Sequence, residues 1–354
     1  MRERQSHIRA EFSRLRHQSR ARHRDIAATL GISEADLLAA HEDAALQPGG
    51  VRVIRMRPQW PEVLGAAHCL GTVMALTRNA SCILENVGRY GPLGGSPSVG
   101  SMTGNAIDLR IFFSHWTHGF AVRDQSGPAE QCSLQFFDPT GTAVHKIFLL
   151  PESHSGGFAE MISRFGLSPS TWEPIGPTEP RPVRHSDRAQ NPEALRTAWA
   201  AMRDVHEFHE LLRHFSLQRL EAFRLAGQPY AREVGTRSLY AVLAAVIDKC
   251  LPVMIFAGNP GALQIHSGIL RNLTQSGVWT NIMDPDFNLH LRHDHIASAW
   301  VVTKPSEDGP IVSLELFDPG GEVIAMLFGA RLPGEPQPAA WSSILDTYAT
   351  EIPA

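Results

Sequence analysis

Several signatures that assign a common chemistry are missing from this chain. It contains no G-x-x-x-x-G-K-[ST] loop, no G-x-G-x-x-G after a strand pattern and no G-x-S-x-G elbow. Its four cysteines include no C-x-x-C pair, and "HEFH" at residues 206–209 lacks the i, i+4 spacing of the H-E-x-x-H zinc motif. The sequence therefore gives no indication of a phosphate-loop enzyme, a dinucleotide-binding domain, an α/β hydrolase, a zincin or a structural zinc site.

Long apolar runs are lacking too. The longest, around residues 239–246, is far shorter than the roughly 20 residues that span a bilayer. The basic N-terminal stretch has no apolar core like that of a secretory signal, and cysteines without framework spacing fit a reducing compartment. We expect a cytoplasmic protein without stable membrane insertion.

A global excess of positive charge is also absent, because the formal net charge of the 354 residues is −4. The first 24 residues are strongly basic, and "RDIAATLGISEADLLAA" after them has some helix-turn-helix character. The corresponding helices later in the chain are not basic. We therefore expect a solvated basic helix here and no nucleic-acid partner, and we keep a DNA-binding regulator only as a minor alternative.

The chain does contain an internal duplication. "VMALTRN" at residues 73–79 resembles "VMIFAGN" at 253–259, and "SLQFFDPTG" at 133–141 resembles "SLELFDPGG" at 313–321. Both pairs are 180 residues apart, and "IDLRIFFSHWTHGFAV" lies opposite "FNLHLRHDHIASAWVV" at the same offset. Matches at one spacing without a gap predict two similar halves.

Each half begins with helical patterns and continues with alternating strand patterns. "DIAATLGISEADLLAAHED" predicts two short helices broken at Gly31, with Ser33 as an N-cap. The segment from Pro192 to Phe215 predicts one long amphipathic helix. "DPTG" and "DPGG" predict tight turns between antiparallel strands. The predicted fold class is α+β, with an internal duplication into two similar halves that each have a large antiparallel β-sheet and flanking helices.

The predicted boundaries are an N-terminal repeat at 1–166, a proline-rich linker at 167–192 and a C-terminal repeat at 193–354. Within the second repeat, Ser216 is expected to cap a further helix that stops at Gly227. "GPLGGSPSVGS" at 91–101 is glycine-rich without a helix pattern after it, and we expect a mobile loop there.

The histidines of "DVHEFHELLRHF" at 204–215 raise the question of a ligand site. Placed 100° apart on a helix, its apolar side chains share one face, His209 lies at the edge of that face, and His206 lies on the next flank with Arg213. A boundary imidazole can reach a ligand lying against the helix, but the pattern alone favours an ordinary surface or boundary histidine. His214 has no assigned role.

A second group of histidines is less informative. "HLRHDH" contains His290, His293 and His295, and strand alternation would place His290 on the face opposite the other two. That spacing argues against a compact three-histidine metal site, and we expect a polar strand and bend.

The second half resembles the bacterial hemin-degrading factor family, which comprises cytoplasmic heme-trafficking proteins of heme-uptake operons. The stretches that carry the resemblance are "PVMIFAGNPGALQIHSG", "NIMDPDFNLHLRHDHIASAWVVTKP", "SLELFDPGGEVI" and "FGARLPGEP", joined by "VMALTRN" and "IDLRIFFSHWTHGFAV" in the first half. The resemblance covers essentially the whole chain, including the duplication.

The resemblance implies one heme b (iron protoporphyrin IX), bound mainly by the second repeat with a contribution from the first. It places the axial iron ligand in the "D-V-H" helix, which here matches His206, with His209 as a possible alternate ligand. Heme propionates need cationic partners and the macrocycle needs apolar walls. The family's basic contacts match Arg110, Arg219, Lys304 and Arg331, and apolar wall positions match Phe112 and Phe256.

One departure from the family pattern bears on activity. Some members have "Q-M-Y-G" where this chain has "MLFG", so Met326 and Phe328 replace a glutamine and a distal tyrosine. The resemblance implies a protein that receives heme, from an inner-membrane importer, for iron acquisition and passes it to a heme oxygenase, degrades it, or does both. The alternative is an oxygenase that opens the porphyrin with O₂ and an external reductant, and the missing hydroxyl argues slightly against it. No catalytic residue is assigned.

Overall fold

The structure is a computed structural model of the full chain, and it describes residues 2–19, 21–42, 49–103, 106–168, 172–175, 191–332 and 334–350. The chain divides into two compact units. Unit 1 comprises Met1–Arg78, Leu84–Glu179 and Gly258–Gln264, and unit 2 comprises Asn79–Ile83, Pro180–Ala257 and Ile265–Ala354. The two short segments occupy corresponding positions of the two repeats, 180 residues apart.

Unit 1 begins with helices and continues with strands. Its elements are α1 (Arg2–Ser19), α2 (His23–Thr29), α3 (Glu34–Ala39), β1 (Val51–Arg55), α4 (Trp60–Ala66), β2 (Thr72–Arg78), β3 (Cys82–Arg89), β4 (Gly94–Gly95), β5 (Val99–Met102), β6 (Asp108–Phe112), β7 (His118–Asp124), β8 (Gln131–Phe137), β9 (Ala143–Leu149) and α5 (Ser155–Phe165). The antiparallel neighbours run β1-β7-β8-β9-β2, with a separate run β4-β5-β6.

Unit 2 repeats this order. Its elements are α6 (Pro192–Ala200), α7 (Glu207–Phe215), α8 (Arg219–Ala226), β10 (Ala231–Val234), α9 (Ser238–Asp248), β11 (Val253–Asn259), β12 (Ala262–Gly268), β13 (Leu273–Ser276), β14 (Trp279–Met283), β15 (Phe287–Arg292), β16 (Ser298–Lys304), β17 (Ile311–Phe317), β18 (Val323–Gly329) and α10 (Ala339–Tyr348). The neighbours run β10-β16-β17-β18-β11 and β13-β14-β15.

The duplication extends to local irregularities. Antiparallel pairing shifts register between Phe136 and Phe137 in unit 1 and between Leu316 and Phe317 in unit 2. The "DPTG" and "DPGG" turns that follow hold Gly141 and Gly321 at φ of 74° and 81°, a conformation that glycine adopts without steric cost. The predicted α+β fold, antiparallel sheets and repeat are confirmed. The predicted domain boundaries stay a prediction, because residues 167–192 lie mostly outside the described residues.

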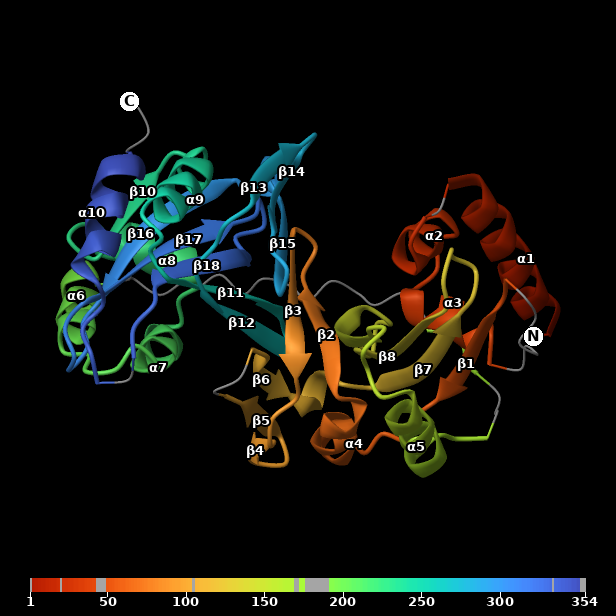
Figure 1. Cartoon of the computed structure of the whole chain (residues 1–354). Helices are drawn as coiled ribbons and strands as arrows, with labels where there is room; N and C mark the ends of the chain where they lie inside the picture. The colour runs from red at the N-terminus through yellow and green to blue at the C-terminus, as the bar shows by residue number, and fades with distance from the viewer. Residues whose placement is uncertain are drawn as a thin grey trace. The chain divides into compact units, whose positions relative to one another are not determined.

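Each face of the main sheet is covered by helices. In unit 1, Phe120 and Val122 of β7 pack against α1–α3, whereas Ala121 on the opposite face belongs to a core with α4 and α5 (Figure 1). In unit 2, Trp300, Val302 and Phe317 pack against α6–α8. The Trp341 side chain of α10 lies close against Gly329 on the other face. These alternating buried side chains follow from strand geometry.

The first predicted helix pair is confirmed. α2 and α3 are separated at Gly31, whose φ is 65°, and the Ser33 side chain accepts a hydrogen bond from the backbone N–H of Asp36. An N-cap of this kind satisfies a donor that the helix cannot pair.

The long helix expected from Pro192 to Phe215 is wrong, because the structure has α6 and α7 with a break between them. Asp204 Oδ1 accepts the backbone N–H of His206, and Glu207 Oε2 accepts that of Arg203. These side chains take over donors that a continuous helix would pair internally.

Two smaller expectations are also wrong. Ser216 ends α7 in the left-handed conformation, and α8 is instead capped by Gln218 with Glu221 in a capping box; its stop at Gly227 is confirmed. The glycine-rich stretch forms the β4–β5 hairpin. The polar strand and bend expected at "HLRHDH" is confirmed, because β15 ends at Arg292 and His293–His295 forms a 3₁₀ turn; strand alternation therefore does not extend to His293 and His295.

Candidate functional site

His206 is the N-cap residue of α7 and its side chain is 91% exposed. Its Nδ1 lies 2.6 Å from Asp204 Oδ1, and that same oxygen accepts the His206 backbone N–H at 2.7 Å. A carboxylate is an acceptor, so the proton of the neutral imidazole lies on Nδ1, and the Nε2 lone pair points away from Asp204. The hydrogen bond from the His206 backbone is the first cause that lowers the pKa of Asp204, and burial opposes it.

The exposure of His206 differs from the boundary position expected from the helical wheel, because the helix starts only at the next residue. The rest of α7 follows the wheel. Phe208 and Leu211 are buried, Leu212 and Phe215 are half-buried, and His209 is exposed. Phe208 anchors the helix by packing against Trp199 at 4.7 Å between ring centroids.

A buried ion cluster lies behind α7. Glu315 on β17 is fully buried, and its carboxylate accepts hydrogen bonds from Arg219 Nε at 2.6 Å, Arg219 Nη2 at 2.9 Å and Lys304 Nζ at 2.7 Å. Ser313 Oγ donates a further bond at 2.9 Å. Arg219 and Lys304 also lie over the Phe208 ring, at 5.1 and 4.8 Å. The cluster therefore ties β16, β17, α7 and α8 together.

Burial and charge act in opposite directions on these groups. Burial lowers the pKa of Lys304 to about 8, and the Glu315 carboxylate counteracts that effect. Burial would raise the pKa of Glu315, but Arg219 and Lys304 outweigh it and hold this pKa well below its usual range. Lys304 and Glu315 are thus both charged at neutral pH.

An apolar strip adjoins the cluster on the same sheet face. Met254 pairs with Phe328, Phe256 pairs with Met326, and Met326 pairs with Glu315 across the strands, so these side chains share one face. The two phenylalanine rings meet edge-on at 5.0 Å, and Arg219 Nη2 lies 3.4 Å from Met326 Sδ. The four apolar side chains are half-exposed. They form an apolar surface bordered by the Arg219 guanidinium.

Arg331 follows β18 and binds Asp308 Oδ2 and the Glu335 carbonyl oxygen, both at 2.8 Å. Its charge contributes to lowering the pKa of Asp204, which places it in the electrostatic neighbourhood of His206. Six of the sequence-predicted residues therefore lie in unit 2: His206, Arg219, Lys304, Arg331, Phe256 and Phe328.

The other residues are placed differently. Arg110 and Phe112 lie on β6 in unit 1, where Arg110 Nη1 binds Asp108 Oδ1 at 2.5 Å and Phe112 is half-buried. His209 is exposed on α7. Lys304 is only 4% exposed and bonded to Glu315, so it does not face solvent in this arrangement.

Sequence reasoning missed Asp204, Glu315 and Met254. Glu315 had a readable signal, because a lone carboxylate in the strand pattern "SLELF" predicts a buried charge that needs cationic partners. Asp204 could be read as an acidic residue just before a helix start, but only if the break after α6 were known. Met254 carries no signal beyond strand alternation.

Two features are absent from the described part of the chain. Within the described ranges, no cluster of three or more His, Cys, Asp or Glu side chains could hold a metal ion by itself. No described helix is long and apolar enough to cross a membrane.

A family model for the haemin-degrading HemS.ChuX domain matches the chain twice, at residues 31–165 and 216–348. The chain belongs to the haemin-degrading HemS/ChuX family. The two matches, one in each repeat, agree with the duplication seen in the element order.

Whole-length relatives give the same assignment. The hemin transport protein HemS of Yersinia enterocolitica is 33% identical over 325 residues, 90% of each chain. The crystal structure of holo-PhuS, a heme-binding protein from Pseudomonas aeruginosa, has a TM-score of 0.91 at 37% identity and covers 98% of this HemS/ChuX chain and 99% of that one. ChuS, described as an E. coli heme oxygenase, has a TM-score of 0.84 at 29% identity, with 96% and 99% covered.

Proposed function

We propose that this chain binds one heme b in unit 2, with Nε2 of His206 as the axial iron ligand, and carries heme in the cytoplasm for iron acquisition. The observation that carries the proposal is the His206–Asp204 pair. Histidines that bind metals typically donate their other ring N–H to a carboxylate, which fixes the tautomer and orients the ring. Here that bond leaves Nε2 exposed at the start of α7.

The surroundings fit the other parts of a heme. The strip of Met254, Phe256, Met326 and Phe328 supplies an apolar wall, and Arg219 at its border has a side chain that is 25% exposed. We assign propionate binding to Arg219 and Arg331, since a guanidinium has five N–H donors and the bonds to Glu315 and Asp308 use only some of them. Lys304 is assigned a positioning role, because it holds Glu315 charged and Glu315 orients Arg219.

Binding is tested by titrating hemin into the full-length protein and following the Soret band. His206→Ala is expected to change the spectrum and weaken binding, whereas His209→Ala, one turn further on the exposed side of α7, leaves both nearly unchanged. If His209→Ala abolishes the wild-type spectrum and His206→Ala does not, the ligand assignment is wrong.

The second candidate function is heme degradation, which the likeness to ChuS supports. A bound heme would supply the iron that binds O₂ and undergoes the redox steps. An oxygenase also needs an open position on the distal side of the heme, with a polar group or water next to it. Met326 and Phe328 provide no hydroxyl on the apolar strip, which favours the carrier.

One experiment separates the two. The hemin-loaded protein is mixed with ascorbate or a reductase, with catalase present. A carrier keeps a stable reduced complex and transfers heme to a cytoplasmic heme oxygenase. Loss of the Soret band together with CO or a bilin-type product identifies degradation instead. The oxygenase and an inner-membrane importer are the partners that this proposal implies, and nucleic acid is not among them.

A further inference from the structure

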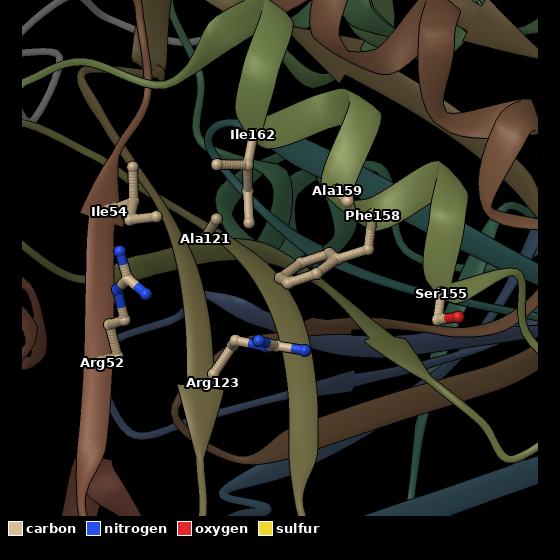
Figure 2. A pocket seen from close by; sticks show the side chains of 8 residues that line it. All are labelled: Arg52, Ile54, Ala121, Arg123, Ser155, Phe158, Ala159 and Ile162. Carbon is tan, nitrogen blue, oxygen red and sulfur yellow. The ribbon is translucent and has the colours of Figure 1, made fainter. Parts of the chain in front are cut away.

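A pocket lies in unit 1, on the face of the sheet that α5 covers (Figure 2). It has a volume of about 200 Å³. Its floor comes from β1 and β7, where Arg52 pairs with Arg123 and Ile54 pairs with Ala121 across the strands. The opposite wall is α5, through Ser155, Phe158, Ala159 and Ile162. None of the residues assigned to heme lines this pocket.

The charged residues that line the pocket are all positive. Two of its eight lining residues are arginines and none is acidic. Arg52 is exposed, and within the described part of the chain its side chain forms no ion pair or hydrogen bond. The Nε of Arg123 is buried without a hydrogen-bond partner among the described residues, and Glu130 Oε1, at 3.6 Å, is its nearest acidic oxygen. Because both Arg123 and Glu130 are more than a third exposed, that ion pair holds the guanidinium only weakly.

The remaining walls are apolar. Figure 2 shows the Phe158 ring reaching from α5 toward Ala121 and Arg123, with Ile54 and Ile162 at the same level. The charged group of an anion that binds in this pocket would therefore contact the arginines, and its apolar part would pack against aliphatic and aromatic side chains. The volume equals that of about seven liquid waters, which limits the body to a short chain.

The repeat provides an internal comparison. In the corresponding part of unit 2, β10 carries Arg232, which pairs with Val301 as Ile54 pairs with Ala121. Its Nη1 and Nη2 donate to the carbonyl oxygens of Ala349, just after α10, and Leu345, in the last turn of α10. At the position of Arg123, unit 2 has Thr303. In unit 2, the arginine is therefore hydrogen-bonded to the end of α10, whereas the two arginines of unit 1 line an open pocket.

We propose that this unit 1 pocket binds a small monocarboxylate with a short apolar body, such as a medium-chain fatty acid. Its carboxylate binds Arg52 and Arg123, since a guanidinium pairs bidentately with a carboxylate. Its chain lies between Ile54, Ala121, Phe158 and Ile162.

The test is calorimetric titration of octanoate into the full-length protein. Saturable binding of one octanoate per chain is expected, and Arg52→Gln and Arg123→Gln are each expected to weaken it by about tenfold, the scale of one lost charged hydrogen-bond partner. Arg89→Gln, an exposed arginine on β3, is the matched control and leaves binding unchanged. Acetate, which has the charge without the chain, and octanol, which has the chain without the charge, are each expected to bind far more weakly.

A variant that fills the pocket provides a control in case the arginine substitutions unfold the protein. Ala159→Trp at an exposed position of α5 keeps both arginines but occupies the pocket, and it is expected to abolish octanoate binding at an unchanged melting temperature. Hemin binding by all these variants is expected to equal that of the wild type, which separates this proposal from the heme site. Absence of saturable binding, equal binding of acetate and octanoate, or binding that survives both arginine substitutions overturns the proposal.

Discussion

At the residue scale, a single carboxylate decides what His206 can do. Asp204 Oδ1 binds both the backbone N–H and Nδ1 of His206, so backbone and ring are oriented by the same atom. An exposed histidine without this bond would rotate freely and would exchange its proton between the two nitrogens. In the proposed site, this arrangement would orient Nε2 as a ligand before the iron binds.

Replacing Asp204 is therefore expected to weaken heme binding. Asp204→Asn removes the negative charge that holds the Nδ1 proton, and the loss of such a partner typically costs 10- to 100-fold in metal affinity, so we expect a change of about that size. Hemin titration measures it. Asp286→Asn, an exposed aspartate on the turn before β15, is the control. An unchanged affinity of Asp204→Asn would show that the pair does not orient the ligand.

The buried Glu315 is important for the stability of unit 2. It is the shared acceptor of two cations and a hydroxyl in unit 2. At the corresponding position unit 1 has Gln135, so an amide fits a strand of this kind. Removing one member of a buried ionic cluster leaves uncompensated charge, which costs far more than the intact pair contributes.

Glu315→Gln is accordingly expected to reduce the free energy of unfolding by about 3 kcal/mol, because Lys304 and Arg219 lose their counterion. Urea unfolding measures the change. Glu322→Gln, which alters an exposed glutamate on the turn before β18, should have little effect. Equal stability of the two variants would contradict the proposed role of the cluster.

At the element scale, the break between α6 and α7 leaves the His206 side chain exposed at the start of α7. A continuous helix would have placed its imidazole on a flank and paired its backbone N–H within the helix. The acidic side chains Asp204 and Glu207 start a new helix instead. The far end of α7 is also specific, because Ser216 ends the helix at φ 54° and ψ 39°.

Glycine suits that end better than serine. A residue with a Cβ loses roughly 1 kcal/mol or more in the left-handed conformation, so Ser216→Gly is expected to raise the free energy of unfolding by up to about 1 kcal/mol. Ser343→Gly within α10 should do the opposite, since glycine is unfavourable in a helix interior. Thermal unfolding of both variants checks the sign, and a lower stability of Ser216→Gly would refute the assignment.

At the scale of the whole molecule, neutral histidines make stability depend on pH. Burial is the first cause that lowers the pKa of His41 to about 4, of His145 to about 3 and of His266 to about 4. In the unfolded chain these imidazoles titrate near pH 6.5. Between the folded and unfolded values the unfolded state binds more protons, so stability rises with pH.

We therefore expect the free energy of unfolding to be fully retained above about pH 6.5 and to fall as the pH drops toward 4. Each such histidine contributes a slope of at most about 1.4 kcal/mol per pH unit. Urea unfolding between pH 7 and pH 5 measures it, and His41→Gln should flatten the curve whereas His7→Gln, on an exposed position of α1, should not. Identical slopes in both variants would contradict this explanation.

The sequence by itself determined the repeat, the α+β class and the turn positions. Periodicity, glycine in tight turns and capping residues are local properties, and a duplication is visible in the letters. The resemblance to a known family added the heme and the residues that surround it.

Only the tertiary structure decided how these residues are used. It placed Lys304 and Arg219 on Glu315, gave His206 a carboxylate partner at a helix start, and aligned Met254, Phe256, Met326 and Phe328 on one sheet face. Such pairings depend on strand register and on competition between side chains and backbone for hydrogen bonds. Both are settled by segments far apart in the sequence, which local patterns do not record.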